Sequence, residues 1–207
     1  NYVPWYVTMP FAVLGAGIFG AAWAFIPAWL QAKRGSHIVI TTIMFNFIGA
    51  ALMVYLLVHV LKPAGAMSPE TRGFAPGGQL PNLDWLMAMF GSRLGPAPLN
   101  VSFIIALVMG VAVWFLIWRT KFGYSVRALG MSKSAATYAG IPYARTVIVT
   151  MLLSGGLAGM MALNVVMGSA DRLQVEFVGG AGFVGIAVSL MGRNHPFGVF
   201  LAAILFG

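Results

Sequence analysis

The chain has 207 residues, of which 60% are hydrophobic and only 8% are charged. Soluble domains carry about 25% charged residues, so this composition excludes an ordinary water-soluble fold and predicts an all-α, polytopic transmembrane helix bundle. The lack of cysteine excludes disulfides, thiolate metal sites and cysteine nucleophiles. A net charge of +8 would indicate nucleic-acid binding in a soluble protein, but here the basic residues lie in short loops between apolar segments.

Four apolar segments are long enough to cross a bilayer, which takes about 20 helical residues. They cover residues 9–30, 36–61, 99–118 and 146–167. Small residues recur at every fourth position of the first segment (Ala16, Gly20, Ala24), and the fourth contains a GxxxG pair, Gly155 and Gly159. Each pattern predicts a face where another helix backbone approaches closely. Pro27 is expected to kink or break the first helix.

Residues 177–207 admit two arrangements. Residues 177–192 would form a helix of only roughly 24 Å, and the break Arg193-Asn194-His195-Pro196 leads into a last, shorter apolar run. The segment either crosses the membrane or forms a re-entrant pair of half-helices, since Gly/Pro-interrupted segments often mark transport sites. The short last run and the lack of a signal peptide lead us to expect an incomplete segment of a longer chain.

Charge asymmetry predicts the side of the membrane that each loop faces. Alternate crossing places eight basic residues and no acid on one side, namely Lys33, Arg34, Arg119, Lys121, Arg127, Lys133, Arg145 and Arg193. All four acids lie on the other side, with four basic residues. Because short cytoplasmic loops are rich in Lys and Arg, we expect residues 119–145 to be a cytoplasmic insert. The Pro-rich residues 62–98 are then an external loop, with a short surface helix at 84–90, and residues 1–207 are one transmembrane domain.

The insert shows a pattern of helix starts and stops. Residues 125–129 are predicted to form a short helix closed by Gly130. Ser132 is expected to cap a second helix over 133–139, closed by Gly140 and followed by Pro142. The two helices would form a compact knob with small residues for close contact and a ring of cations for an acidic-rimmed pocket.

Polar side chains within the apolar segments are the candidates for contact with a polar solute. Asn46 lies between Phe45 and Phe47 near the middle of the second segment, and Asn164 lies near the end of the fourth. An amide at bilayer depth is costly unless it is paired, so it faces other helices or a watery path. Both readings remain open here: a hydrogen bond between helices, or a contact with the solute.

Catalytic and nucleotide-binding motifs are missing from the sequence. The run around Gly130 and Lys133 lacks the spacing of a phosphate-binding loop, so the chain is not expected to bind ATP. It has no HExxH motif, and its three histidines lie near predicted interfaces. We therefore expect no enzymatic activity, no cofactor and no metal site. The apolar segments hold no Asp or Glu, which argues against proton coupling.

Several runs together resemble one family. They are HIVITTIMFNFI, RTKFGYSVRALGMSKSAATYAGI, LLSGGLAGMMA and GFVGIAVSLMGRNHPFGVFLAAILFG. They are similar to permease subunits of bacterial ABC importers in the branched-chain amino acid, ribose and simple-sugar permease superfamily, and most similar to its nucleoside-uptake branch. Val184 departs from that branch, where many relatives place a polar residue, and this bears on the solute more than on the fold.

The resemblance implies a type II-like permease of about ten spans in the cell (inner) membrane. Its partners would be a second permease, homologous or identical, two cytoplasmic ATP-binding subunits, an extracytoplasmic solute-binding lipoprotein and membrane lipid, with no nucleic acid. Residues 125–140 match the coupling loop that contacts the ATPase. We therefore assign ATPase coupling to Arg127, Gly130, Ser132, Lys133, Tyr138 and Gly140.

The expected function is ATP-driven import of a nucleoside or simple sugar by alternating access, with ATP hydrolysis on a separate subunit. A nucleoside site would offer aromatic faces to a flat base and amides to its edge and to the ribose. The candidates for the substrate pathway are Phe45, Asn46, Phe47, Asn164, Ser189 and Asn194. The alternative is a secondary transporter or channel without an ATPase. A membrane enzyme would need a catalytic group at bilayer depth, where the three histidines do not lie, and a structural subunit would not explain the capped, acid-free insert.

Overall fold

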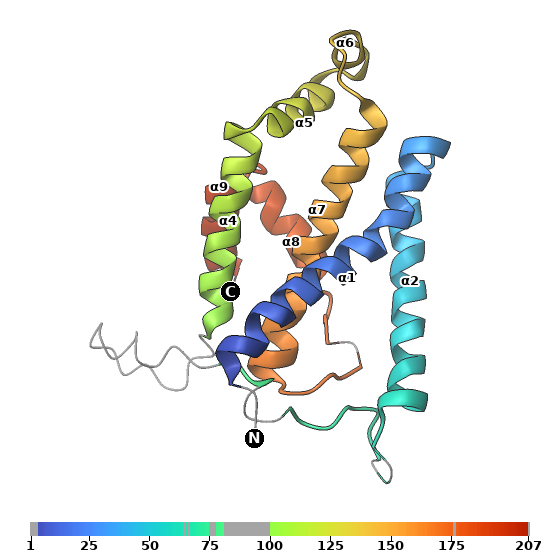
Figure 1. Cartoon of the computed structure of the whole chain (residues 1–207), viewed down its shortest axis with the longest axis vertical. Coiled ribbons are helices and arrows are strands. Elements are labelled where there is room, and N and C mark those ends of the chain that lie inside the picture. The colour runs from blue at the N-terminus through green and yellow to red at the C-terminus, as the bar shows by residue number, and fades with distance from the viewer. Residues whose placement is uncertain are drawn as a thin grey trace, which may run out of the picture. The chain divides into compact units, whose positions relative to one another are not determined.

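A computed structural model describes residues 4–63, 65, 67–74, 78–80, 100–175 and 177–206. Its elements are helices, as the sequence predicted (Figure 1). The surface helix expected at residues 84–90 lies outside the described residues. The chain divides into two compact units: the first comprises Asn1–Ser102 and Val147–Phe177, and the second comprises Phe103–Thr146 and Val178–Gly207. Whether they form one transmembrane domain stays a prediction.

Four helices have the length and composition to span a membrane. They are α1 (Trp5–Arg34), α2 (Ile38–Leu56) with its π-helical continuation η1 (Leu57–Leu61), α4 (Val101–Arg119), and α7 (Tyr143–Leu163) with its π-helical continuation η3 (Asn164–Ser169). These helices confirm the four predicted spans, with ends that differ by a few residues. The helix α1 runs through Pro10 and Pro27 and ends at Gly35, whose left-handed backbone closes it. The prediction that Pro27 breaks this helix was therefore wrong.

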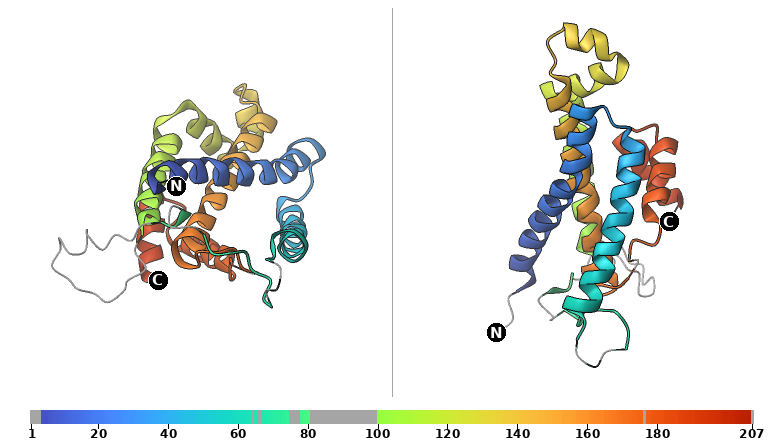
Figure 2. Two further views of the ribbon diagram at one scale, coloured as in Figure 1. Left: turned by 60° about the horizontal axis from the view of Figure 1, so that its bottom comes forward. Right: turned by 90° about the vertical axis from the view of Figure 1, so that its right-hand side faces the viewer.

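Within the first unit, α1 and α7 cross with their backbones in contact (Figures 1 and 2). A Cβ atom on Gly20 would collide with the carbonyl oxygen of Gly155 and lie 3.0 Å from the Cα of Gly159. A Cβ on Gly159 would likewise meet the carbonyl oxygen of Ala16. The two small-residue stripes thus serve as contact faces, as predicted, and each is the other's partner. Such close approach lets dispersion forces hold helices together in a solvent that gives no hydrophobic drive.

The last two helices belong to the second unit and are short. The helix α8 (Ala181–Met191) has 11 residues, or about 16 Å of helix, which is about half of a bilayer core. The helix α9 (Pro196–Phe206) lies beside it in a hairpin (Figure 2). Gly192 and Gly198 lie at the point of contact, where a Cβ on Gly198 would collide with the carbonyl oxygen of Gly192. The length of α8 favours the re-entrant arrangement for residues 177–207.

Candidate functional site

The insert begins with a helix that is longer than predicted. The helix α5 spans Lys121–Met131, because Thr120 caps it: the Gly123 amide donates to the Thr120 hydroxyl at 3.1 Å. The predicted start at residue 125 and the stop at Gly130 were therefore wrong. Gly130 lies inside α5, and the helix ends only where Ser132 adopts an extended backbone with φ −157°.

The second helix of the insert confirms both predicted end signals. The helix α6 spans Lys133–Tyr138, and the Ser132 hydroxyl accepts the Ala135 amide at 3.3 Å. Gly140 has φ +81°, and its amide donates to Thr137 while the next amide donates to Ala136, both at 3.0 Å. This pair of bonds is a Schellman closure, which explains why glycine is needed there. Helices α5 and α6 pack together as the predicted knob (Figure 1).

The joint between α4 and α5 depends on Gly123. This residue is buried, and a Cβ on it would collide with the carbonyl oxygens of Leu116 and Ile117 at the end of α4. Both carbonyls belong to the last turn of α4, and that of Leu116 accepts the Thr120 hydroxyl. The close contact fixes the direction in which the knob leaves α4.

Three of the five cations of the insert lie over aromatic rings of the same unit. Arg119 lies over Trp114 at 5.8 Å, Arg127 over Trp118 at 4.6 Å and Lys133 over Tyr143 at 3.9 Å, each measured from the charged group to the ring centroid. Three cations of the predicted ring are therefore oriented by aromatic side chains of their own chain. All three cationic residues remain exposed.

The knob also exposes large side chains. Tyr138 is 94% exposed and Met131 is 90% exposed. An open hollow of about 600 Å³ is lined by Lys133, Ser134, Thr137 and Tyr138. Aromatic and Met side chains are enriched in protein interfaces, so this surface has the composition of a docking site.

In the first unit, Phe45 packs against another helix, whereas Asn46 and Phe47 are exposed. Phe45 meets Trp23 of α1 edge to face, with ring centroids 5.8 Å apart. Phe47 is 69% exposed, and Asn46 is exposed as well. Within the described part of the chain, no hydrogen bond reaches the Asn46 side chain. Its amide must therefore find a partner beyond these residues: a solute, water or another helix.

Asn164 instead takes part in a polar cluster with Asn100 and Ser102. Its Oδ1 accepts from Asn100 Nδ2 at 3.2 Å and from the Ser102 hydroxyl at 2.9 Å. Asn100 is only 2% exposed, and its Oδ1 caps α4 by accepting the Ser102 amide at 3.2 Å. Asn164 opens the π-helical segment η3, a kind of distortion that often occurs at functional sites. Asn100 was not predicted as part of this cluster, although Asn just before an apolar run is a capping signal.

We predict that Asn164→Ala lowers the free energy of unfolding by about 1–3 kcal/mol, because it leaves the buried Asn100 amide without its acceptor. Thermal unfolding of the purified protein in detergent measures the effect. Ser169→Ala is the control, since this exposed side chain bonds only to the backbone of its own segment in the described structure. Unchanged stability in Asn164→Ala would show that the cluster contributes little.

In the second unit, Ser189 and Asn194 contact each other. The Ser189 hydroxyl donates to Asn194 Oδ1 at 2.8 Å across the turn between α8 and α9. Arg193 and Asn194 have φ values of +53° and +55°, a left-handed conformation that Asn tolerates but that costs energy in Arg. Such strain persists only where the surrounding structure holds it in place.

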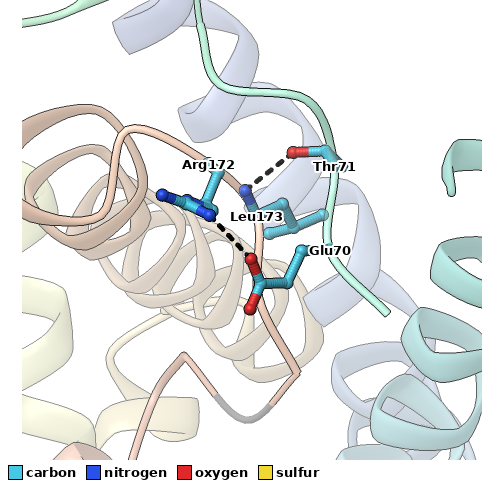
Figure 3. Close-up of polar contacts among 4 residues, drawn as sticks. All are labelled: Glu70, Thr71, Arg172 and Leu173. Carbon is cyan, nitrogen blue, oxygen red and sulfur yellow. Dashed lines mark hydrogen bonds and ion pairs between the residues drawn. The ribbon is translucent and has the colours of Figure 1, made fainter. Parts of the chain in front are cut away.

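On the predicted external side, residues 70–74 are joined to residues 171–173 of the same unit (Figure 3). The Arg172 guanidinium pairs with the Glu70 carboxylate at 2.9 Å, and the Leu173 amide donates to the Thr71 hydroxyl at 2.9 Å. The Thr71 amide returns a bond to the Leu173 carbonyl at 3.1 Å. The exposed ion pair contributes little by itself. The contacts place both segments at one end of the unit, as the charge-based topology requires.

The four membrane-length helices define a multi-pass helical membrane protein. The family model described as branched-chain amino acid transport system / permease component matches residues 1–207. The chain therefore belongs to this family of permease components. No solved structure matches it.

Three of the curated relatives that match almost the whole chain are permeases of ABC transporters. The guanosine ABC transporter permease NupP of Bacillus subtilis is 33% identical over 99% of the chain and 57% of the relative. The glucose ABC transporter permease TsgB13 of Haloferax volcanii is 30% identical over 99% and 54%. The nucleoside ABC transporter permease NupB of Lactococcus lactis is 29% identical over 99% and 56%. The chain thus spans little more than half the length of these relatives.

Proposed function

We propose that this chain is part of a permease subunit that imports a nucleoside or a simple sugar at the expense of ATP, by alternating access. The observation that carries the proposal is the similarity to permeases named for guanosine, nucleosides and glucose over 99% of the chain. The four membrane-length helices and the structured insert agree with it.

We infer the partners from the exposed surface of the insert and from the similarity to permeases of ABC transporters. A knob with exposed Tyr138 and Met131 suits a cytoplasmic ATP-binding subunit, where ATP would be hydrolysed. The residues proposed for this contact are Arg127, Gly130, Ser132, Lys133, Tyr138 and Gly140. A second permease, homologous or identical, would complete the translocation path, and a solute-binding lipoprotein would deliver the solute from outside.

Asn46 is the strongest candidate for solute contact. It is exposed on α2 about 12 Å along the axis from Ile38, so its amide lies within the apolar span. An amide there can bond a base edge or a ribose hydroxyl. Phe47 offers an exposed ring next to it, whereas Phe45 packs on Trp23. Asn164, Ser189 and Asn194 stay candidates, with part of their hydrogen-bonding capacity used within the chain.

The test is uptake of radiolabelled guanosine and of glucose into proteoliposomes that hold the complete transporter with its ATP-binding subunits. We expect uptake that requires ATP, and a roughly tenfold higher KM in Asn46→Ala, since one lost hydrogen bond to the solute costs about 1.4 kcal/mol. Met44→Ala, an exposed apolar truncation on the same helix, should leave the KM unchanged. Uptake driven by an ion gradient without ATP would instead support a secondary transporter.

A further inference from the structure

Trp118 lies where three elements of the second unit meet. It is the penultimate residue of α4. The guanidinium carbon of Arg127, on α5, lies 4.6 Å from its ring centroid. The ring of His195, just before α9, lies 5.9 Å away between centroids, at an interplanar angle of 46°. One indole ring therefore contacts both the insert and the α8–α9 turn.

The turn that carries His195 is tightly constructed. The Asn194 amide donates to the Ser189 carbonyl at 2.9 Å, and the His195 amide donates to the Gly192 carbonyl at 3.1 Å. Ser189 adds its side-chain bond to Asn194 at 2.8 Å. At Gly192 a Cβ would collide with the backbone of Val199. A displacement of His195 is thus carried into both α8 and α9, because the turn has little room to deform.

We propose that Trp118 transmits movement of the insert to the α8–α9 hairpin, with Arg127 and His195 as its two contacts. Arg127 is then an internal link in addition to a residue of the docking surface. Tryptophan suits this role because its ring offers the strongest aromatic attraction for a cation. The inference rests on the proposed function, since it assigns the route by which a push from an ATP-binding subunit reaches a candidate part of the solute path.

The experiment compares Trp118→Leu, Trp118→Phe and Trp114→Leu in the complete transporter, reconstituted in proteoliposomes with guanosine and, in parallel, glucose as probes. The quantity measured is ATP hydrolysed per solute taken up. We expect this ratio to rise about tenfold in Trp118→Leu, since a cation–π contact corresponds to a factor of roughly two to thirty. Trp118→Phe keeps a ring and should give a smaller rise.

Trp114→Leu is the matched control. Trp114 lies one turn earlier on α4. The guanidinium carbon of Arg119 lies 5.8 Å from its ring centroid, but within the described residues the ring contacts no other ring. Its ATP-to-solute ratio should stay near that of the wild type. An unchanged ratio in Trp118→Leu, or an equal rise in Trp114→Leu, would overturn the proposal.

A second measurement separates this inference from the proposed function. In the purified protein, Arg127→Gln and His195→Gln should shift the unfolding temperature non-additively, and additively once Trp118 is leucine. If the wild type imports neither probe, the proposed function fails on those solutes, while non-additive shifts still support the link through Trp118. Additive shifts with Trp118 present would refute the link whatever the transporter carries.

Discussion

Replacing Gly123 by valine is expected to reduce ATP-driven uptake at least fivefold, while the protein still inserts and assembles. A side chain at this position collides with the carbonyl oxygens of Leu116 and Ile117, which are backbone atoms that cannot rotate away. Overpacking costs about 1–3 kcal/mol, which corresponds to a factor of about 5 to 150. We expect α5 to tilt away from α4 to relieve the collision. The knob then leaves α4 in a different direction and no longer fits the ATP-binding subunit. Uptake and ATP hydrolysis in proteoliposomes measure the result.

Gly110→Val provides the control for this change. Gly110 lies inside α4, and a Cβ there meets nothing within 4 Å, so the two variants share the helix-propensity penalty but not the collision. We expect Gly110→Val to transport at close to the wild-type rate. Equal activities in the two variants would mean that the contact between α4 and α5 does not set the position of the insert.

Gly20→Leu is expected to prevent α1 and α7 from packing. The side chain would meet the carbonyl oxygen of Gly155 and the backbone of Gly159, so both helices must separate along their contact face. We expect a loss of at least about 3 kcal/mol, near the upper end of overpacking costs. At about 2–4 °C per kcal/mol, the unfolding midpoint should fall by roughly 6–12 °C or more.

Gly15→Leu makes the same substitution on the same helix at a position where a Cβ meets nothing within 4 Å. Its unfolding midpoint in detergent should stay within a few degrees of the wild type. A comparable drop in both variants would show that lost glycine flexibility, and not the crossing with α7, governs stability at Gly20.

The sequence predicted the contact faces of α1 and α7 but not that they contact each other. The recurrence of small residues at Ala16, Gly20 and Ala24 shows that a backbone approaches, because only small side chains permit it. The identity of the partner depends on how helices far apart in the chain assemble. Periodicity within one helix carries no information on that.

The insert was predictable wherever one residue decides the local backbone. Ser132 and Gly140 act as expected, because capping and a left-handed closure are properties of three or four neighbouring residues. Gly130 did not end its helix, since glycine permits a stop without requiring one. The rings beneath Arg127 and Lys133 belong to other helices, so these tertiary contacts could not be foreseen from the insert alone.

The candidate solute path shows a similar division. The polarity of Asn46 and Asn164 within apolar spans identified both as residues that need a partner. The structure provides Asn100 and Ser102 as partners for Asn164, while Asn46 faces outward from the described residues. The two amides were indistinguishable in the sequence, because burial and pairing arise only from tertiary packing.

We propose that the knob formed by α5 and α6 docks on an ATP-binding subunit. The direct measurement places the photoreactive residue p-benzoylphenylalanine at Tyr138, which is 94% exposed, and at Met67, which is fully exposed in the predicted external loop. After irradiation of the assembled transporter, position 138 should cross-link to the ATP-binding subunit and position 67 should not. Cross-linking of that subunit at position 67, or its failure at position 138, would refute docking of the knob on the ATP-binding subunit.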